Sequence, residues 1–368
     1  MVHYIRFLKP PKHNSNTHSP TISALVTITT DLGDSFLHTD TTLTAHLLCG
    51  DDETHTYDIC TRKLFPWKAG SRELSISIPL AREVSARFES AGGGRLAVSE
   101  SGSARREDVV ERVVAGWSAP FGAGGEAEKV VERWVSVRDR EGKQANIYVW
   151  EEMGNSIALH VWDAALACTI CFQHALEGRD SSMVSLREIF QRNNAPSGES
   201  GPLSAIELGT GCGVVGIGLA QMLRNCKALL TDLPAAEELA SRNISNSQLA
   251  EGSRLEFRAL DWDDEDAGED IYGSTYDMII VSDCTYNSDS LPALVRVLSK
   301  LTSTSSPGAM VLVAMKRRHA SEEVFFELME NAGFWIYDQG CVLLPSLVVT
   351  AEDGVEKVEI YAFRWRNE

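Results

Sequence analysis

Hydrophobic positions follow two different patterns along the chain. In the first 90 residues they alternate with polar positions, as in Ile22–Thr29 and Leu74–Ile78, and Leu43–Cys49 is a third segment of this kind. A period of two, with many β-branched residues, predicts half-buried β-strands. We therefore expect residues 1–90 to form a β-rich N-terminal region, which we interpret as a structural extension because it carries no recognisable chemical motif.

Residues 91–128 interrupt the alternation. Two glycine-rich runs, AGGG at 91–94 and GAGG at 122–125, enclose a stretch at 107–115 that can form a short helix. Glycine-rich composition is typical of flexible linkers. We interpret this region as a flexible linker to a larger domain that covers residues 129–368.

From residue 129 onward, apolar runs alternate with helical patterns. A β-hairpin is expected over 130–150 and a helix over 159–176. Seven further strands are expected at 205–208, 228–232, 255–260, 276–282, 310–315, 334–337 and 358–363, with helices at 214–224, 234–246, 292–301 and 321–331. This alternation predicts an α/β fold, a mostly parallel Rossmann-like sheet with helices on both faces.

The segment AIELGTGCG at 205–213 ends one of these strands with glycines at alternate positions, Gly209, Gly211 and Gly213. A residue without a Cβ can adopt positive φ and lets a ligand lie against the backbone. The helix that follows would direct unpaired N–H groups at that ligand. With Gly216, the last two glycines also match the dinucleotide fingerprint, which leaves an NAD-dependent oxidoreductase as an alternative.

Acidic residues also stand near the ends of predicted strands. Glu207 precedes the first glycine by two positions, and Asp232 ends the next strand. A carboxylate there can accept both hydroxyls of a ribose, so the pair suggests a bound nucleoside. Two later strands are followed by Asp261-Trp262 and by Asp283-Cys-Thr-Tyr286.

Composition narrows the classes of function. The net charge of −18 argues against broad contact with nucleic acid phosphates and is compatible with a basic protein partner. No apolar run approaches the roughly 20 residues of a membrane span, and the first 12 residues lack the apolar core of a secretory signal. The eight cysteines lack framework spacing, which fits a reducing compartment, and we interpret Cys168 and Cys171 as core residues rather than metal ligands.

Taken in order, these motifs resemble the seven-β-strand methyltransferases that use S-adenosylmethionine (SAM), and more closely their family 16 protein-lysine branch, whose mark is Asp-x-x-Tyr after the fourth strand. The resemblance covers residue 129 to the C-terminus. It implies that SAM is the cofactor and that the Glu207–Gly213 motif helps to bind it. Within that motif, Gly209, Thr210 and Gly211 would approach the methionine part of SAM.

The resemblance also assigns roles to single residues. Asp232 would hold the ribose, and Asp261 and Trp262 would flank the adenine. Trp162, ahead of the glycine motif, and Ser282 would contact the cofactor. Asp283 would position an acceptor lysine, and Tyr286 would line its channel.

The resemblance implies a basic, lysine-bearing protein as substrate, with elongation factors and chaperones as targets in this family. Alternatives are methylation of a small-molecule amine and a SAM-fold domain retained only for binding. Nucleic acid is not expected, because Cys284 and Thr285 replace the two prolines of base and glutamine methylases; the basic run KRRH at 316–319 is interpreted as a solvated loop. We expect a monomer without metal or membrane contact, located in the cytoplasm and also in the nucleus.

Overall fold

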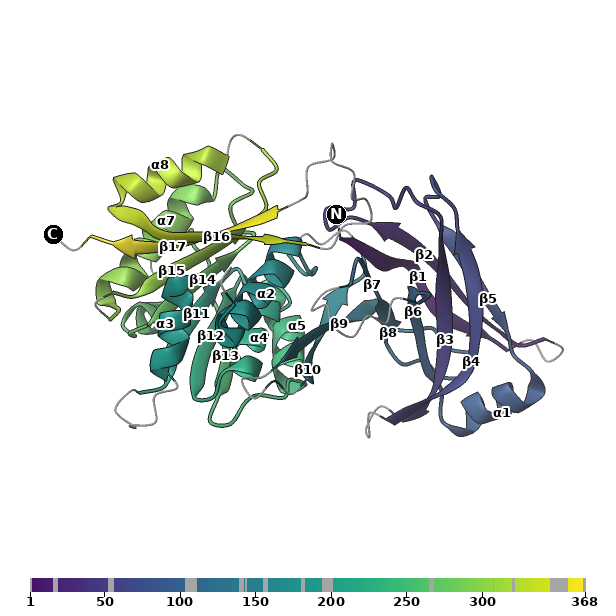
Figure 1. The fold of residues 1–368 in the computed structure, drawn as a ribbon. Coiled ribbons are helices and arrows are strands. Elements are labelled where there is room, and N and C mark those ends of the chain that lie inside the picture. The colour runs from purple at the N-terminus through teal and green to yellow at the C-terminus, as the bar shows by residue number, and fades with distance from the viewer. Residues whose placement is uncertain are drawn as a thin grey trace. The chain divides into compact units, whose positions relative to one another are not determined.

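The computed structural model describes residues 2–366 apart from 16–18, 52–55, 103–110, 139–141, 143, 155–157, 180–182, 194–200, 265–267, 307, 320–321 and 345–356. The chain divides into two compact units (Figure 1). One comprises residues 1–134, 149–160 and 345–354, and the other comprises 135–148, 161–344 and 355–368. The predicted boundary at residue 129 therefore differs from the structure, because the strands at 130–138 and 144–152 each contribute residues to both units.

The first unit is built from β-strands, as the alternating pattern indicates. One sheet has the strand order β5-β2-β1-β7, formed by β5 (Leu74–Pro79), β2 (Thr21–Thr29), β1 (His3–Asn14) and β7 (Val113–Val114). The other has the order β10-β9-β8-β6-β3-β4, formed by β10 (Gln144–Glu152), β9 (Val130–Arg138), β8 (Gly116–Ser118), β6 (Gly94–Glu100), β3 (Thr41–Asp51) and β4 (Thr56–Trp67). A helix that the pattern did not predict, α1 (Arg82–Ser90), connects β5 to β6.

The prediction of a flexible linker over residues 91–128 is wrong where the structure describes this segment. Strands β6, β7 and β8 lie within it, and Val113 and Val114, expected in a short helix, form β7; residues 107–110 of that expected helix lie outside the described residues. Gly93 and Gly94 of the first glycine run serve close packing rather than flexibility. A Cβ on Gly94 would stand 1.9 Å from the carbonyl oxygen of Leu48 on the neighbouring strand β3, so only glycine fits.

The cysteine interpretation also needs one correction. Cys49 on β3 and Cys60 on β4 are joined by a disulfide, and the other six cysteines are free. Strands β3 and β4 pair antiparallel with an irregularity between Leu47 and Leu48, which brings these two positions together without any regular cysteine spacing. Cys168 and Cys171 are buried on the second helix, as core residues, and burial raises the pKa of both thiols.

The second unit is a seven-stranded sheet of order β13-β12-β11-β14-β15-β17-β16, which confirms the predicted α/β fold (Figure 1). Five strands are parallel: β11 (Leu203–Leu208), β12 (Cys226–Asp232), β13 (Arg254–Ala259), β14 (Met278–Ser282) and β15 (Met310–Met315). β17 (Lys357–Trp365) pairs antiparallel with both β15 and β16 (Phe334–Leu343). The strand order reverses between β11 and β14, and a reversal of this kind opens a crevice at the carboxyl ends of the two strands.

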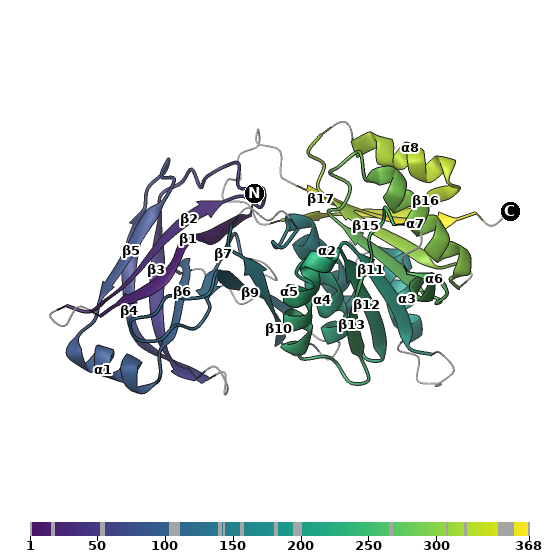
Figure 2. The same cartoon turned by 180° about the vertical axis from the view of Figure 1, so that it is seen from behind.

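Helices cover both faces of this sheet (Figures 1 and 2). α2 (Asp163–Glu177) packs on α3 (Val184–Asn193) and α4 (Val214–Met222), and α5 (Glu237–Ser245) follows a 3₁₀ turn at Pro234–Ala236. On the other face α7 (Leu291–Thr304) contacts α6 (Glu269–Tyr272) and α8 (Glu323–Asn331). Helix α2 begins four residues later than predicted, and the expected cap of α8 at Ser321 lies outside the described residues.

Alternation along β11 directs side chains to the two faces of the sheet. Ile206 and Leu208 join the core formed with α7 and α8, whereas Glu207 between them points to α4, where it bonds to Gly216. A charged side chain thus lies in an apolar layer, directly below the glycine turn. The burial of a carboxylate there requires partners, and these partners define the site.

Candidate active site

The turn between β11 and α4 has the backbone that its glycines predict. Gly209, Gly211 and Gly213 have φ of 68°, 53° and 83°, all in the left-handed region. The turn is tied down by two hydrogen bonds, from Thr210 N to the Thr231 carbonyl on β12 (3.0 Å) and from Gly213 N to the Thr210 carbonyl (2.8 Å). The result is a fixed loop at the carboxyl end of β11, followed at once by the N-terminus of α4.

Glu207 stabilises this loop through hydrogen bonds from the turn and from α4. Its Oε2 accepts hydrogen bonds from Thr210 Oγ1 (2.8 Å) and from the backbone N–H of Gly216 in α4 (2.9 Å). Burial raises the pKa of Glu207 to about 7; the two hydrogen bonds act against this and the charge of Asp232 adds to it. The carboxylate predicted to bind cofactor is therefore engaged in shaping the loop that would do so.

Asp232 lies at the end of β12 and is tied to the same loop. Its Oδ2 accepts from the Gly211 N–H (2.8 Å) and its Oδ1 from the Leu233 N–H (2.7 Å). Burial raises the pKa of Asp232 in spite of these two donors. The neighbouring acidic motif is placed differently, because Asp261 is exposed and accepts from the Asp263 N–H (3.0 Å), which caps a turn.

The fourth strand end packs directly against the glycine turn. A Cβ on Gly209 would stand 2.5 Å from Cys284 Sγ and 3.5 Å from the ring of Trp262. The Cys284 thiol in turn lies 3.5 Å from the Leu208 carbonyl oxygen. Gly209, Trp262 and Cys284 are therefore neighbours, as expected for strand ends that meet at the reversal of strand order.

Ser282, the last residue of β14, and Asp283 directly precede Cys284 at this strand end. Asp283 has φ of 56°, uncommon for a residue with a side chain, and its N–H donates to the Ala314 carbonyl (2.9 Å). Ser282 Oγ is buried and has no hydrogen-bond partner within the described part of the chain. Three residues further on, Tyr286 is 56% exposed, and its pKa is raised by partial burial and by the charges of Cys284, Asp232 and Asp283.

A second group of side chains closes the site from β15, and the sequence interpretation missed it. Arg318 donates from Nη1 to Asp283 Oδ1 (2.7 Å) and from Nη2 to Asp283 Oδ2 (2.8 Å). Its guanidinium stands 5.4 Å from the ring centroid of Trp162, at the start of α2. The next residue of α2, Asp163, accepts from Lys316 Nζ (2.9 Å).

The interpretation of 316–319 as a solvated loop is therefore wrong for Lys316 and Arg318, whereas Arg317 and His319 are exposed. Lys316 and Arg318 are buried or nearly so, and both are paired with carboxylates at the site. The signal that could have revealed them is their position directly after the buried strand β15, whose carboxyl end meets those of β11 and β14. The exposed Arg317 pairs with Glu359 on β17.

The structure places Trp262, Asp232, Ser282 and Asp283 around the glycine turn, and Asp261 is next to Trp262 with its carboxylate accepting from the Asp263 N–H. The arrangement suits SAM for three reasons: a glycine loop with left-handed backbone, a carboxylate at the end of β12 on one side of it, and the unsatisfied hydroxyl of Ser282 at the end of β14 on the other side. Among the described residues, no group of three or more His, Cys, Asp or Glu is placed to hold a metal ion. No helix in the described part is long and apolar enough to cross a bilayer.

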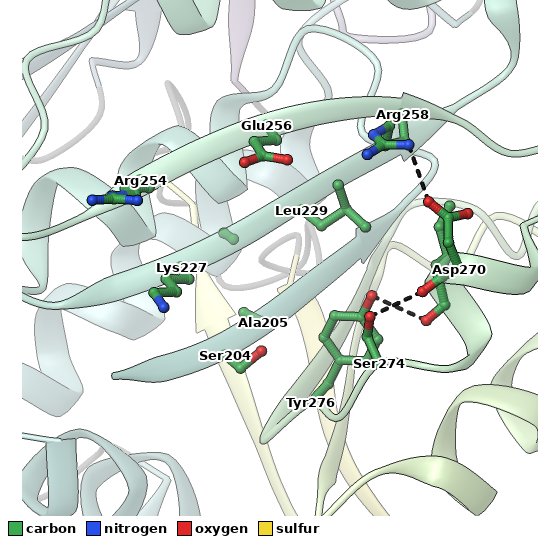
Figure 3. A pocket seen from close by; sticks show the side chains of 12 residues that line it. Ser204, Ala205, Lys227, Leu229, Arg254, Glu256, Arg258, Asp270, Ser274 and Tyr276 are labelled. Carbon is green, nitrogen blue, oxygen red and sulfur yellow. Dashed lines mark hydrogen bonds and ion pairs between the residues drawn. The ribbon is translucent and has the colours of Figure 1, made fainter. Parts of the chain in front are cut away.

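A cavity of about 320 Å³ lies elsewhere, over the first residues of β11 and β12 and along β13 (Figure 3). Its polar lining comes mainly from Lys227, Arg254, Glu256 and Arg258, and Arg258 pairs with Asp270 (3.1 Å). Ser204 and Lys227 stand at the beginnings of their strands, at the edge opposite the glycine turn. This cavity is therefore not the candidate active site.

Comparisons with known proteins agree with the geometry. A family model described as lysine methyltransferase matches residues 141–332. The chain is 23% identical over 342 residues to a UPF0665 family protein of Schizosaccharomyces pombe, covering 91% of this chain and 94% of the relative. It is 30% identical over 183 residues to protein N-lysine methyltransferase METTL21A of Xenopus tropicalis, covering 49% of this chain and 70% of the relative.

A third relative is calmodulin-lysine N-methyltransferase of Arabidopsis thaliana, 26% identical over 127 residues and covering 34% of this chain and 41% of the relative. The family match spans more than half of the chain and includes the glycine turn, Asp232 and the Asp283-to-Tyr286 motif. The fold, the loop and the matched segment together show that this chain is a SAM-dependent methyltransferase and belongs to the lysine methyltransferase family.

Proposed function

We propose that the chain methylates a lysine side chain of another protein, with Asp283 orienting the acceptor amine and Tyr286 lining its path. The observation that carries this proposal is the contrast between the two side chains. Asp283 is 8% exposed and lies beside the glycine turn, whereas Tyr286 is 56% exposed. The charge of Asp283 contributes to the raised pKa of the Tyr286 phenol. A long side chain that passes Tyr286 would reach Asp283.

The roles of the other residues follow from their places in the site. The glycine turn and Ser282 would hold the methionine part of SAM, and Asp232 would hold the ribose. Trp262 would flank the adenine, and Trp162 would also contact the cofactor. When bound, SAM supplies a methyl group activated by the positive charge on sulfur. We assign Glu207 to the support of the loop, because Thr210 and Gly216 occupy its Oε2.

The chain's own part in the reaction is to align a neutral amine. A lysine has an ordinary pKa of about 10.4, so at pH 7 the neutral form costs roughly 4 to 5 kcal/mol. Desolvation in a site such as this lowers that cost. The bound SAM would supply the methyl group to the amine and keep the electron pair of the C–S bond on sulfur, and the methylated ammonium product would give a proton to water. Asp283 needs only to accept an N–H bond and hold the amine in line.

The test uses labelled SAM and a heat-treated eukaryotic cell lysate as acceptor. We expect label in protein, recovered as Nε-methyl-lysine after hydrolysis, and mass spectrometry would then identify the protein and the lysine. Asp283→Ala should lose at least 100-fold in rate, the size of effect expected from a lost positioning group, while it still binds S-adenosylhomocysteine in calorimetry. Label found only in small molecules would refute a protein acceptor, and full turnover by Asp283→Ala would remove Asp283 from the mechanism.

A further inference from the structure

The ion pair between Asp283 and Arg318 is part of the site's architecture and not a surface contact. Arg318 Nη1 donates to Asp283 Oδ1 at 2.7 Å and Arg318 Nη2 to Asp283 Oδ2 at 2.8 Å, and the side chains of Asp283 and Arg318 are 5% and 14% exposed. A two-point contact of this kind fixes the plane of a carboxylate as well as its position. The residue proposed to orient the acceptor amine is therefore itself oriented by Arg318.

Arg318 is held in turn on several sides. Its Nη1 lies 3.3 Å from the Lys316 carbonyl oxygen, and its guanidinium stands over the Trp162 ring. Its backbone N–H and that of His319 donate to one oxygen of the buried Glu322, at 2.9 and 3.1 Å. These contacts fix the conformation of Arg318. A residue that positions another side chain to within a fraction of an ångström must itself be held in this way.

Other ionisable groups also lie near Asp283. Lys316 is engaged with Asp163, which lies fully buried at the start of α2. On the opposite side, toward β11 and β12, the ionisable groups are the acids Glu207 and Asp232, with Cys284 and Tyr286 from the same segment as Asp283. Without Arg318, Asp283 would face this acidic side without the cation that contacts it directly.

We propose that Arg318 is a positioning residue for methyl transfer, which fixes the Asp283 carboxylate and offsets its charge so that the acceptor lysine is oriented without being held as an ammonium ion. The proposal rests on the function proposed above. A carboxylate has about four acceptor positions, and the bidentate arginine engages two of them. A carboxylate with uncompensated charge would instead raise the pKa of the amine and favour its unreactive form.

The test is the pH profile of the rate. Initial rates of label transfer are measured between pH 6 and 10 at saturating SAM and saturating heat-treated lysate protein. A unit charge about 7 Å from the amine, at an effective dielectric constant of about 20, shifts a pKa by roughly one to two units. Arg318→Gln should therefore move the acidic limb of the profile upward by about one to two pH units. Its rate at pH 7 should fall at least roughly tenfold and recover at pH 9.

Matched variants separate charge from structure. Arg318→Lys keeps the positive charge but loses the two-point contact with the carboxylate. We therefore expect a lower maximum rate, and an acidic limb of the pH–rate profile within about half a pH unit of that of the wild type. Arg317→Gln removes the neighbouring arginine, which contacts Glu359 and not Asp283, and its profile should superimpose on that of the wild type. Adding Asp283→Asn to Arg318→Gln should return the limb toward its original position, because the uncompensated charge is then gone.

The outcomes are distinct. The proposal would be overturned if Arg318→Gln lost rate equally at every pH and its acidic limb stayed in place. It would also be overturned if the acidic limb of Arg318→Lys moved as far as that of Arg318→Gln. Affinity for S-adenosylhomocysteine, measured by calorimetry, should stay within about threefold of the wild type in every variant and verifies that the site is folded. If the wild-type protein transfers no label to protein lysine, the proposed function fails, a result that the comparison of variants cannot mimic.

Discussion

The buried carboxylate of Glu207 predicts an unusual dependence of stability on pH. The side chain is 2% exposed, and the desolvation of its charge raises its pKa to about 7 from the ordinary value of 4.5. The perturbation that isolates this effect is Glu207→Gln, which keeps the size of the side chain and an oxygen that can accept from Thr210 and Gly216. Unlike glutamate, glutamine cannot ionise.

The sign follows from proton binding in the two states. Below about pH 4.5 the folded and unfolded chains both carry the proton, and the stabilising contribution is fully present. Between pH 4.5 and 7 the unfolded chain releases the proton first, so the free energy of unfolding falls as the pH rises through this window. Above pH 7 both states are ionised and the contribution is lost. A difference of about 2.5 pKa units corresponds to about 3 kcal/mol.

The assay is equilibrium unfolding in urea at pH 5, 6, 7 and 8. Between pH 5 and 8 the wild type should lose about 2 to 3 kcal/mol of stability relative to Glu207→Gln, the part of the 3 kcal/mol that lies within this window. A pH-independent difference for Glu207→Gln would refute the reasoning, since it would mean that this carboxylate is equally acidic in both states.

Three further predictions concern the loop and the first unit. Gly209→Ala should weaken binding of S-adenosylhomocysteine at least tenfold in calorimetry, because its Cβ would stand 2.5 Å from Cys284 Sγ and its φ is positive; wild-type affinity would show that the turn adapts. Asp232→Ala should weaken the same binding by roughly 10- to 100-fold, through loss of the carboxylate and of its bond to the loop, and unchanged affinity would contradict its placement at the cofactor. Thiol titration of the denatured, unreduced chain should find six thiols, because Cys49 and Cys60 are paired, and eight thiols would refute the disulfide. Cys49→Ser should lower the free energy of unfolding by about 3 kcal/mol, the loop-entropy value for a sequence separation of 11 residues.

Much of the second unit could be predicted from the sequence because its signals are local. A buried parallel strand needs an apolar run, and a turn with positive φ favours glycine, so the sequence at 205–213 indicates its own conformation. The linker prediction failed because composition cannot distinguish a glycine that is flexible from one that is crowded. Gly94 is crowded by the carbonyl of Leu48, 46 positions earlier in the chain, and nothing near it in sequence reports that contact.

The same distinction explains which parts of the site were missed. Glu207, Asp232 and Asp283 stand next to motifs, and each could be recognised from its immediate neighbours. Arg318 carries no motif, and a basic run in a loop is usually solvated. Its role depends on the pairing of β14 with β15, which brings the residues after each strand to one edge of the sheet.

The ion pair also changes the interpretation of Asp283 itself. Read from the sequence, an aspartate at the end of a strand is an isolated negative group that would attract an ammonium ion. In the structure, Asp283 and Arg318 form a unit whose charges balance, with the ring of Trp162 against the arginine. Such a unit offers hydrogen-bond acceptors without much net attraction for a proton, and this is what an enzyme needs when its nucleophile is an amine that must be bound and yet remain neutral. In the mechanism that we propose, the chemistry therefore depends on the pair, and the motif that marks the site supplies only one half of it.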